Sequence, residues 1–125
     1  MKISPEEAAA RMAEGFTYVD VRSEPEFGEG RPRGSINVPL SILTETGLAQ
    51  DPDFLANVRE RFPDLDTPLI VGCQAGGRSG RAARLLMDAG YTRILDQRAG
   101  WDGSRGTFGE VTEPGWRRLD LPVDP

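Results

Sequence analysis

Residues 69–79 read Leu69-Ile70-Val71-Gly72-Cys73-Gln74-Ala75-Gly76-Gly77-Arg78-Ser79. The apolar run at the start is typical of a buried strand in a parallel sheet. The alanine- and leucine-rich segment from Ser79 to Ala89, closed by Gly90, is typical of a helix. A strand followed so closely by a helix predicts an α/β fold, and it places Cys73 at the carboxyl end of the strand, where open α/β sheets bind their ligands.

The loop after Cys73 has the composition of an anion-binding turn. Gly76 and Gly77 allow the backbone between Cys73 and Arg78 to curl with its N–H groups facing inward. The N-terminus of the following helix adds a partial positive charge at the same place. Together with Arg78, these groups favour the thiolate form of Cys73, which becomes a candidate nucleophile that needs no histidine.

Each of these residues also has a purely structural interpretation. Cys73 could be a buried cysteine in a strand-to-helix turn, Arg78 a solvated residue at the start of the helix, and Ser79 a helix cap. The combination of glycines, arginine and serine favours the functional interpretation. An arginine in the first turn opposes the helix dipole, and a nearby anion explains its presence better.

Strands and helices alternate along the rest of the chain. The expected elements are a helix from about Pro5 to Glu14 with a Ser4–Glu7 capping box, a strand over Thr17–Val21, a surface loop over residues 23–34, a short apolar run at Ile36–Val38, a helix that opens at Asp51-Pro52 and ends at Phe62, and a strand over Thr92–Leu95. In the Gly- and Pro-rich segment 98–125, Trp101, Phe108 and Trp116 are the expected anchors. This alternation predicts a parallel sheet with helices on both faces.

Composition limits the possible functions. The chain has 125 residues, 38% hydrophobic and 28% charged, which predicts one soluble globular domain over residues 1–125. A formal net charge of -5 argues against nucleic acid and anionic membranes as partners. Histidine is absent, which removes the commonest general base and the usual transition-metal ligand, so we expect neither a metal nor a cofactor.

Cysteine content and the N-terminus indicate a compartment. A single cysteine cannot form an intramolecular disulfide, which is typical of a reducing environment. Residues 1–7 lack the apolar run of a signal peptide, and no later stretch approaches the length that spans a bilayer. We therefore expect a cytoplasmic protein.

The chain resembles the rhodanese family in several segments that together cover nearly its whole length. The segments are Cys73-Gln74-Ala75-Gly76-Gly77-Arg78-Ser79, similar to an active loop of Cys, four residues, Arg and Ser; Tyr18–Arg22 with Glu26-Phe27; Gly34–Leu40; Ala99–Gly103; and Gly115-Trp116 through Leu121-Pro122. Two positions depart from the family pattern. Arg31 replaces a customary histidine, from which we expect altered loop packing rather than lost activity. Ala99 stands where a glycine is common, which slightly weakens that motif and says little about mechanism.

The resemblance implies a fold and an activity. The fold is a central parallel five-stranded sheet with helices on both faces. The activity is that of a sulfurtransferase, in which Cys73 takes a sulfane sulfur from a donor such as thiosulfate, holds it as a persulfide, and gives it to a thiophilic acceptor. The implied cradle of the persulfide consists of Gln74, Ala75, Gly76, Gly77, Arg78 and Ser79. Asp20 and Arg22 are implied to be structural, as a buried polar network beneath the loop.

Two other functions are compatible with parts of this pattern. Related phosphatases and arsenate reductases also use a thiolate in an arginine-closed loop, but with five residues between Cys and Arg where this chain has four, and they usually need an acid for the leaving oxygen. Non-catalytic rhodanese-like modules bind partners and commonly lack the cysteine that is present here. Both features favour the sulfurtransferase.

The substrates stay open at the level of sequence. Arg81 and Arg84 on the helix, with Arg31 and Arg33, either place positive charge over the thiolate and attract an anionic donor, or form an ordinary solvated face. The acceptor is cyanide, a thiol, or a cysteine of a partner protein.

Overall fold

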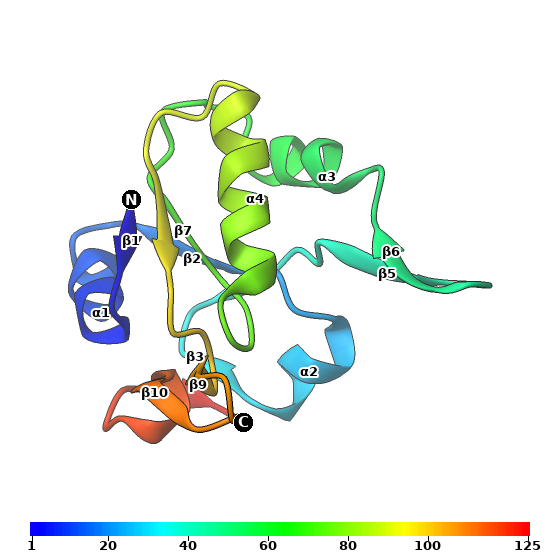
Figure 1. Cartoon of the computed structure of the whole chain (residues 1–125). Helices are drawn as coiled ribbons and strands as arrows, with labels where there is room; N and C mark the ends of the chain where they lie inside the picture. The colour runs from blue at the N-terminus through cyan, green and yellow to red at the C-terminus, as the bar shows by residue number, and fades with distance from the viewer.

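The computed structural model describes all 125 residues and contains a five-stranded parallel sheet (Figure 1). Its strands, in spatial order, are β1 (Lys2–Ile3), β8 (Ile94–Gln97), β7 (Leu69–Gly72), β2 (Thr17–Asp20) and β4 (Ile36–Asn37). Every pair of neighbours is parallel. The predicted fold class is therefore confirmed.

Helices cover both faces of this sheet (Figure 1). They are α1 (Pro5–Ala13), α2 (Glu24–Glu29), α3 (Phe54–Arg61) and α4 (Gly77–Asp88), with a 3-10 turn, η1, at Trp116–Arg118. Helix α1 packs on one face, and α3 and α4 pack on the other. None of the helices has the length and apolar character that crossing a bilayer requires.

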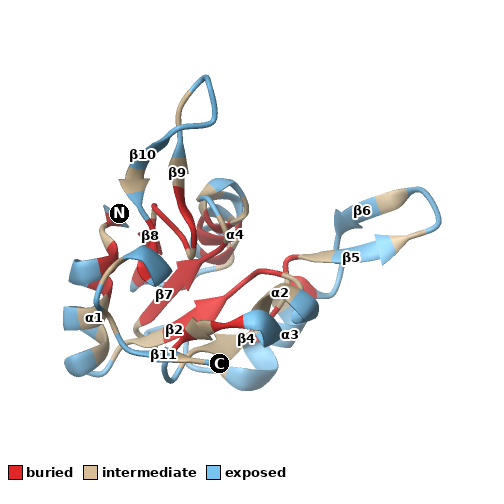
Figure 2. Cartoon of the chain, turned by 90° about the horizontal axis from the view of Figure 1, so that it is seen from below, coloured by how far each residue is buried: buried red, intermediate tan, exposed pale blue.

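Side chains along β2 and β7 alternate between the two faces of the sheet, and each face has its own hydrophobic core. Tyr18 and Ile70 face α1 and pack with Trp116, whereas Val19 and Val71 face α3 and α4. All five residues are buried. Figure 2 shows β7 and most of β2 in the colour of buried residues. The two central strands are covered on both sides, which gives the functional loop that follows β7 a rigid base.

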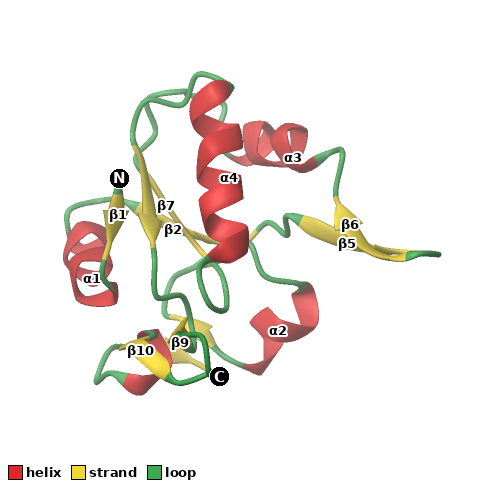
Figure 3. Ribbon diagram, viewed as in Figure 1, coloured by secondary structure: helices red, strands yellow, loops and turns green.

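Three two-stranded antiparallel sheets surround the main one (Figure 3). They pair β3 (Arg31–Pro32) with β11 (Val123–Asp124), β9 (Gly103–Arg105) with β10 (Val111–Pro114), and β5 (Ser41–Thr44) with β6 (Gly47–Gln50). The hairpin formed by β5 and β6 projects away from the body of the protein (Figures 1 and 3). No strand was predicted from the sequence over these residues.

The helix α1 forms as its capping box predicts. The Ser4 N–H donates to Glu7 Oε1 at 3.0 Å, and the Glu7 N–H donates to Ser4 Oγ at 3.1 Å. Gly15 follows the helix with φ +110°, a conformation that suits glycine.

Several sequence predictions were wrong in detail. Residues 23–34 are not a loop throughout: Ser23 caps α2 with a second capping box to Glu26, the same Ser-x-x-Glu signal that starts α1. The helix expected from Asp51 begins only at Phe54, because the Asp51 carboxylate caps the turn by accepting from the Asp53 N–H at 2.8 Å. Phe108 is 93% exposed at a turn and anchors nothing, whereas Trp116 is buried. The strand expected from Thr92 begins at Ile94.

Candidate active site

The carboxyl ends of three neighbouring strands bring the predicted site residues to one edge of the sheet. Asp20 lies level with Gly72, and Val71 lies level with Asp96. Cys73 follows Gly72 directly, so Asp20, Cys73 and Asp96 all lie within one residue of the carboxyl end of their strands. This is the edge at which parallel sheets bind ligands.

Cys73 is buried, and its sulfur faces the loop that follows it. Its Sγ accepts a hydrogen bond from the Gly76 N–H at 3.1 Å. Gly72, the residue before it, has no room for a side chain, since a Cβ at that position would lie 1.9 Å from Tyr18 Oη. The thiol therefore sits at the base of the loop.

The loop presents backbone N–H groups that have no partner. The N–H groups without any hydrogen-bond acceptor in the structure belong to Gln74, Ala75, Gly77, Arg78 and Ser79. The Gly76 carbonyl is held from the opposite side, by Ser79 Oγ at 3.1 Å and by the Gly80 N–H at 3.2 Å. Because the C=O and N–H of one peptide unit point in opposite directions, this anchoring aims the Gly77 N–H away from the helix. Unpaired amides at a helix N-terminus form an anion-binding nest.

Glycines and a neighbouring segment fix the shape of the loop. Gly76 has φ +107°, and a Cβ there would lie 2.5 Å from Arg98 O. From outside the loop, the Trp101 N–H donates to Cys73 O at 2.7 Å and the Asp102 N–H to Gln74 O at 2.9 Å. The segment after β8 thus clamps the loop through its carbonyls and leaves its N–H groups free.

The Arg78 side chain does not lie free over the thiol. Its Nη1 and Nη2 donate to Glu26 Oε1 and Oε2 at 2.7 and 2.9 Å. The hydrogen bond from Arg78 is the main reason that the pKa of Glu26 falls from 4.5 to about 2, and the same bond raises the pKa of Arg78. The anion that offsets the arginine in the first turn is this carboxylate.

Asp20 and Arg22 form a buried ion pair beneath the loop. Their side chains are 2% and 1% exposed, and Arg22 Nη2 lies 2.7 Å from Asp20 Oδ2. The same guanidinium donates to the Gly30 carbonyl at 2.7 Å and to Gln74 Oε1 at 3.4 Å. It therefore connects β2, the end of α2 and the loop.

Ser79 and Asp96 support the loop from the other side. Ser79 Oγ lies 2.7 Å from Asp96 Oδ1, and both residues are buried. Burial raises the pKa of Asp96, while the hydrogen bond from Ser79 opposes the rise. Asp96 thus acts on the loop through the hydroxyl that also holds the Gly76 carbonyl.

The four arginines that the sequence offered as possible attractors of an anionic donor differ in their contacts. Arg81 and Arg84 are exposed and form no ion pair. Arg31 stacks over the Phe27 ring at 4.7 Å, and Arg33 lies 3.5 Å from Asp124. The sequence left open whether these four arginines place positive charge over the thiolate or form a solvated face. Among them, only Arg81 and Arg84 have side chains without an ion pair or an aromatic contact.

A cleft of about 670 Å³ adjoins the loop. It is lined by Arg22, Glu26, Glu29, Gln74, Trp101, Asp102 and Arg117. Asp102 pairs with Arg105, Arg117 and Arg118. Burial alone would raise the pKa of Asp102, but the hydrogen bonds from Arg117 and Arg105 outweigh it and lower that pKa.

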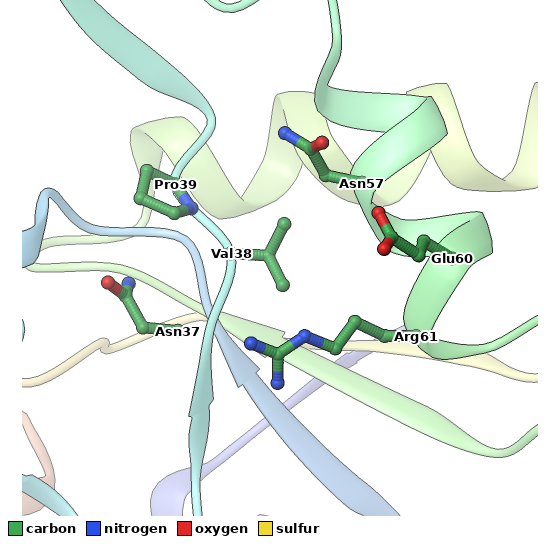
Figure 4. Close-up of a pocket in the computed structure, with 6 residues that line it drawn as sticks. All are labelled: Asn37, Val38, Pro39, Asn57, Glu60 and Arg61. Atoms are coloured by element: carbon green, nitrogen blue, oxygen red, sulfur yellow. The ribbon is translucent and has the colours of Figure 1, made fainter.

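A second pocket, of about 440 Å³, lies between the segment after β4 and helix α3 (Figure 4). Its lining consists of Asn37, Val38, Pro39, Asn57, Glu60 and Arg61, none of which is a predicted site residue. No group of three His, Cys, Asp or Glu side chains in the protein could hold a metal ion.

Three residues with clear contacts in the site were given no role by the sequence. Glu26 and Asn37 lie in segments that carried the family resemblance, and Asn37 Nδ2 donates to the backbone carbonyls of Asp20 and Arg22 at 2.9 Å each. Asp96 belongs to no recognised motif. The only indication in the sequence is that a polar residue in a strand buried on both faces is unusual and needs a hydrogen-bond partner.

Comparison with known proteins places the chain in a family. Residues 4–105 match the rhodanese-like domain. Thiosulfate sulfurtransferase 16 of Arabidopsis thaliana, a protein named as chloroplastic, is 44% identical over 82 residues, which is 66% of this chain and 68% of that protein. Thiosulfate sulfurtransferase GlpE of Haemophilus influenzae is 28% identical over 123 residues, which is 98% of this chain and 93% of that protein.

A solved structure and further relatives agree. The crystal structure of Rv0390 from M. tuberculosis superposes with a TM-score of 0.79 at 30% identity, and covers 98% of this chain and 96% of that one. The chain spans 59% of the length of two other plant relatives that it matches. With the family match over residues 4–105, these similarities show that the chain belongs to the rhodanese family.

Proposed function

We propose that the protein is a sulfurtransferase that moves a sulfane sulfur from a donor such as thiosulfate to cyanide or a thiol, through a persulfide on Cys73, with residues 1–125 acting as one domain. The observation that carries the proposal is the sulfur of Cys73 at the base of a loop with five unpaired N–H groups. Thiosulfate sulfurtransferases among the relatives support the same reaction class.

The first half of the reaction loads the cysteine. The Cys73 thiolate attacks the outer sulfur of thiosulfate, a bond forms between the two sulfurs, and the S–S bond of the donor breaks. Its electron pair leaves with sulfite. The product is a Cys73 persulfide whose terminal sulfur carries the negative charge.

The second half unloads the cysteine. The acceptor, cyanide or a thiolate, attacks the terminal sulfur, and the S–S bond to Cys73 breaks with its electron pair returning to Sγ. Thiocyanate or an acceptor persulfide leaves. No outside oxidant or reductant is needed, because sulfane sulfur is only passed on.

The loop from Gln74 to Ser79 is the proposed cradle for both states. Unpaired amides stabilise a negative sulfur, whether it is the thiolate or the terminal atom of the persulfide. Arg78 contributes its N–H, while its side chain holds the loop to α2 through Glu26. Asp20 and Arg22 are assigned the supporting role that their burial suggests.

The binding-module and phosphatase alternatives predict different chemistry. A binding module would take up no sulfur, although Cys73 and its loop are intact. A phosphatase or arsenate reductase would need a larger loop for a tetrahedral oxyanion and an acid beside it. The two carboxylates that hydrogen-bond to side chains of the loop, Glu26 and Asp96, accept from Arg78 and Ser79.

The test is the intact mass of the reduced protein before thiosulfate, after it, and after subsequent cyanide. We expect the wild type to gain one sulfur and to lose it to cyanide with formation of thiocyanate, and we expect Cys73→Ser to gain nothing. Aryl phosphate and arsenate serve as control substrates and should not be turned over. If the wild type gains no sulfur from thiosulfate or from a cysteine-derived persulfide, the proposal is wrong.

The donor can be tested through Arg81, the exposed and unpaired arginine nearest the start of α4. If it attracts an anionic donor, Arg81→Ala should reduce the salt dependence of thiosulfate turnover, because screening acts on exposed charges. Arg93→Ala, outside α4, is the control. An unchanged salt dependence in Arg81→Ala would leave the arginine as a solvated helix residue.

A further inference from the structure

The projecting β5–β6 hairpin carries the largest group of neighbouring exposed apolar side chains. Leu43 is 80% exposed, Leu48 70% and Ile42 40%. Leu43 and Leu48 are cross-strand partners, so they lie on the same face of the hairpin. Apolar side chains gathered on a protruding two-stranded element are typical of an interaction surface, because nothing in the fold requires them there.

The base of the hairpin forms one wall of a cleft of about 610 Å³. Leu43, Leu48 and Ile42 line it together with the start of α2 and the segment around Pro39 and Asp51. The remaining lining residues are Ser23, Glu24, Pro25, Ser41 and Asn57. These apolar residues therefore border a space large enough to receive side chains of another molecule.

The surface around this cleft is acidic. Residues 23–30 and 34–58 contain Glu24, Glu26, Glu29, Glu45, Asp51 and Asp53 and not a single lysine, arginine or histidine. Only Glu26 among these acids is in an ion pair, with Arg78. Arg61 lines the adjoining pocket, which shares Pro39 and Asn57 with this cleft, and Glu60 accompanies it there (Figure 4). An apolar centre with an acidic rim is complementary to an apolar segment flanked by basic residues.

The cleft is continuous with the active loop through one short helix. Glu24 and Pro25 of α2 line the cleft, and Glu26 of the same helix holds Arg78 of the loop. A helix of six residues is about 9 Å long. A molecule that fills the cleft is therefore separated from the active loop by the length of α2.

We propose that the β5–β6 hairpin and the acidic cleft beside it bind a protein acceptor of sulfur that presents an apolar segment flanked by lysine or arginine, with its reactive cysteine nearby. This inference rests on the proposed function and names the class of acceptor. A second copy of this chain is a poorer occupant, because two such faces would bring their acidic residues together.

The transfer that this docking serves is balanced. The acceptor thiolate attacks the terminal sulfur of the Cys73 persulfide, the bond from that sulfur to Sγ breaks, and its electron pair returns to Cys73. The acceptor leaves as a persulfide. Docking adds no step: it places the acceptor thiolate beside the loop.

Two synthetic peptides test the proposal. Both carry one cysteine between leucines; one is flanked by lysines and the other by glutamates, and a serine-for-cysteine version of each is used for binding by fluorescence anisotropy. We expect the lysine peptide to bind at least about tenfold more tightly at low salt than the glutamate peptide, and to take sulfur from the persulfide correspondingly faster. Equal binding of the two peptides would overturn the proposal.

Substitutions in the hairpin test whether the preference for the lysine peptide arises there. Leu43→Ser/Leu48→Ser should bind the lysine peptide no better than the glutamate peptide. The matched control is Phe108→Ser, which removes an equally exposed apolar side chain from the β9–β10 turn, remote from the hairpin (Figure 2), and should behave as the wild type. A double variant that keeps the preference would overturn the docking site. So would a wild-type dimer that the double variant dissociates in sedimentation, since the face would then be a self-interface.

Cyanide separates this proposal from the one on which it rests. Thiocyanate formation needs no docking, so the double variant should match the wild type with cyanide while losing the preference for the lysine peptide. If no form of the protein makes thiocyanate, the proposed sulfurtransferase function fails, and the serine peptides still report whether the surface binds.

Discussion

Arg78 and Glu26, 52 residues apart in sequence, form a bidentate ion pair, with Nη1 2.7 Å from Oε1 and Nη2 2.9 Å from Oε2. The pair ties the first turn of α4 to α2. An arginine that would otherwise oppose the helix dipole is thereby neutralised and becomes a clamp on the active loop. The N–H groups of the loop are left as the main attraction for a negative sulfur.

The first prediction concerns Glu26→Gln, which breaks this clamp. Because the pair is partly exposed, we expect a loss of about 1 kcal/mol in the free energy of unfolding at pH 7 after screening by solvent, together with slower sulfur transfer. The pKa of Glu26 is lowered from 4.5 to about 2, so its contribution is complete above pH 4.5 and disappears as the pH falls towards about 2. Urea unfolding at pH 7 and pH 3.5 should show the difference shrinking.

Glu24→Gln is the matched control for this variant. Glu24 lies in the same helix, is exposed and makes no ion pair. Its substitution should leave both stability and transfer to cyanide, which needs no docking, near those of the wild type. A Glu26→Gln protein with unchanged stability at pH 7 would show that the pair contributes nothing to the fold.

The second prediction compares adjacent glycines in the loop. Gly76→Ala places a methyl 2.5 Å from Arg98 O on a backbone with φ +107°, and we expect it to cost about 1–3 kcal/mol of stability and to lower persulfide formation strongly. Gly77→Ala meets nothing within 4 Å and starts a helix, so it should be tolerated. Intact-mass assays after thiosulfate and urea unfolding measure both effects. Equal behaviour of the two variants would contradict the proposed importance of the loop shape.

The third prediction concerns Ser79→Ala. It removes the donor to the buried Asp96 carboxylate and should cost about 1–3 kcal/mol at pH 7. Burial raises the pKa of Asp96 above 3.8, so the folded protein binds the proton of this carboxyl more tightly than the unfolded chain does. The stability that this proton contributes is therefore lost as the pH rises from 3.8 through the pKa of the folded state. The cost of Ser79→Ala should therefore be smaller near pH 4 than at pH 7 in urea unfolding.

A second background isolates the charge of Asp96. In Asp96→Asn, no carboxylate remains to be ionised, so the additional change Ser79→Ala should cost less at pH 7, and that cost should no longer vary between pH 4 and pH 7. A cost that is the same in both backgrounds would mean that the Ser79 hydroxyl acts only on the Gly76 carbonyl.

The sequence was sufficient for the elements whose signals are local. The run Leu69–Val71, the capping box at Ser4 and the glycines after Cys73 each determine backbone conformation within a few residues, and the structure has the expected strand, helix and loop. Helix α2 was not predicted although its capping box is equally local, because the glycines and prolines around it favour a loop. The hairpin over residues 41–50 lacks a strong turn signal and depends on its own cross-strand pairs.

The partners of the site residues could not be predicted in the same way. Arg78 finds Glu26, and Ser79 finds Asp96, only after the sheet has placed β2, β7 and β8 side by side. Such contacts depend on the register between strands, which no single stretch of sequence contains. The exposure of Phe108 is a similar case, since an aromatic residue in a short hairpin packs only if another element reaches it.

The last prediction concerns the buried pair of Asp20 and Arg22, tested with Arg22→Lys. An ammonium cannot reach Asp20, the Gly30 carbonyl and Gln74 at once, as the planar guanidinium does, so the conservative change should leave buried acceptors unpaired and cost about 3–5 kcal/mol. Arg33→Lys is the control, because its pair with Asp124 is exposed and should be worth at most about 1 kcal/mol. Urea unfolding measures both. If Arg22→Lys is as mild as the control, the buried pair is not what supports the loop beneath Gln74.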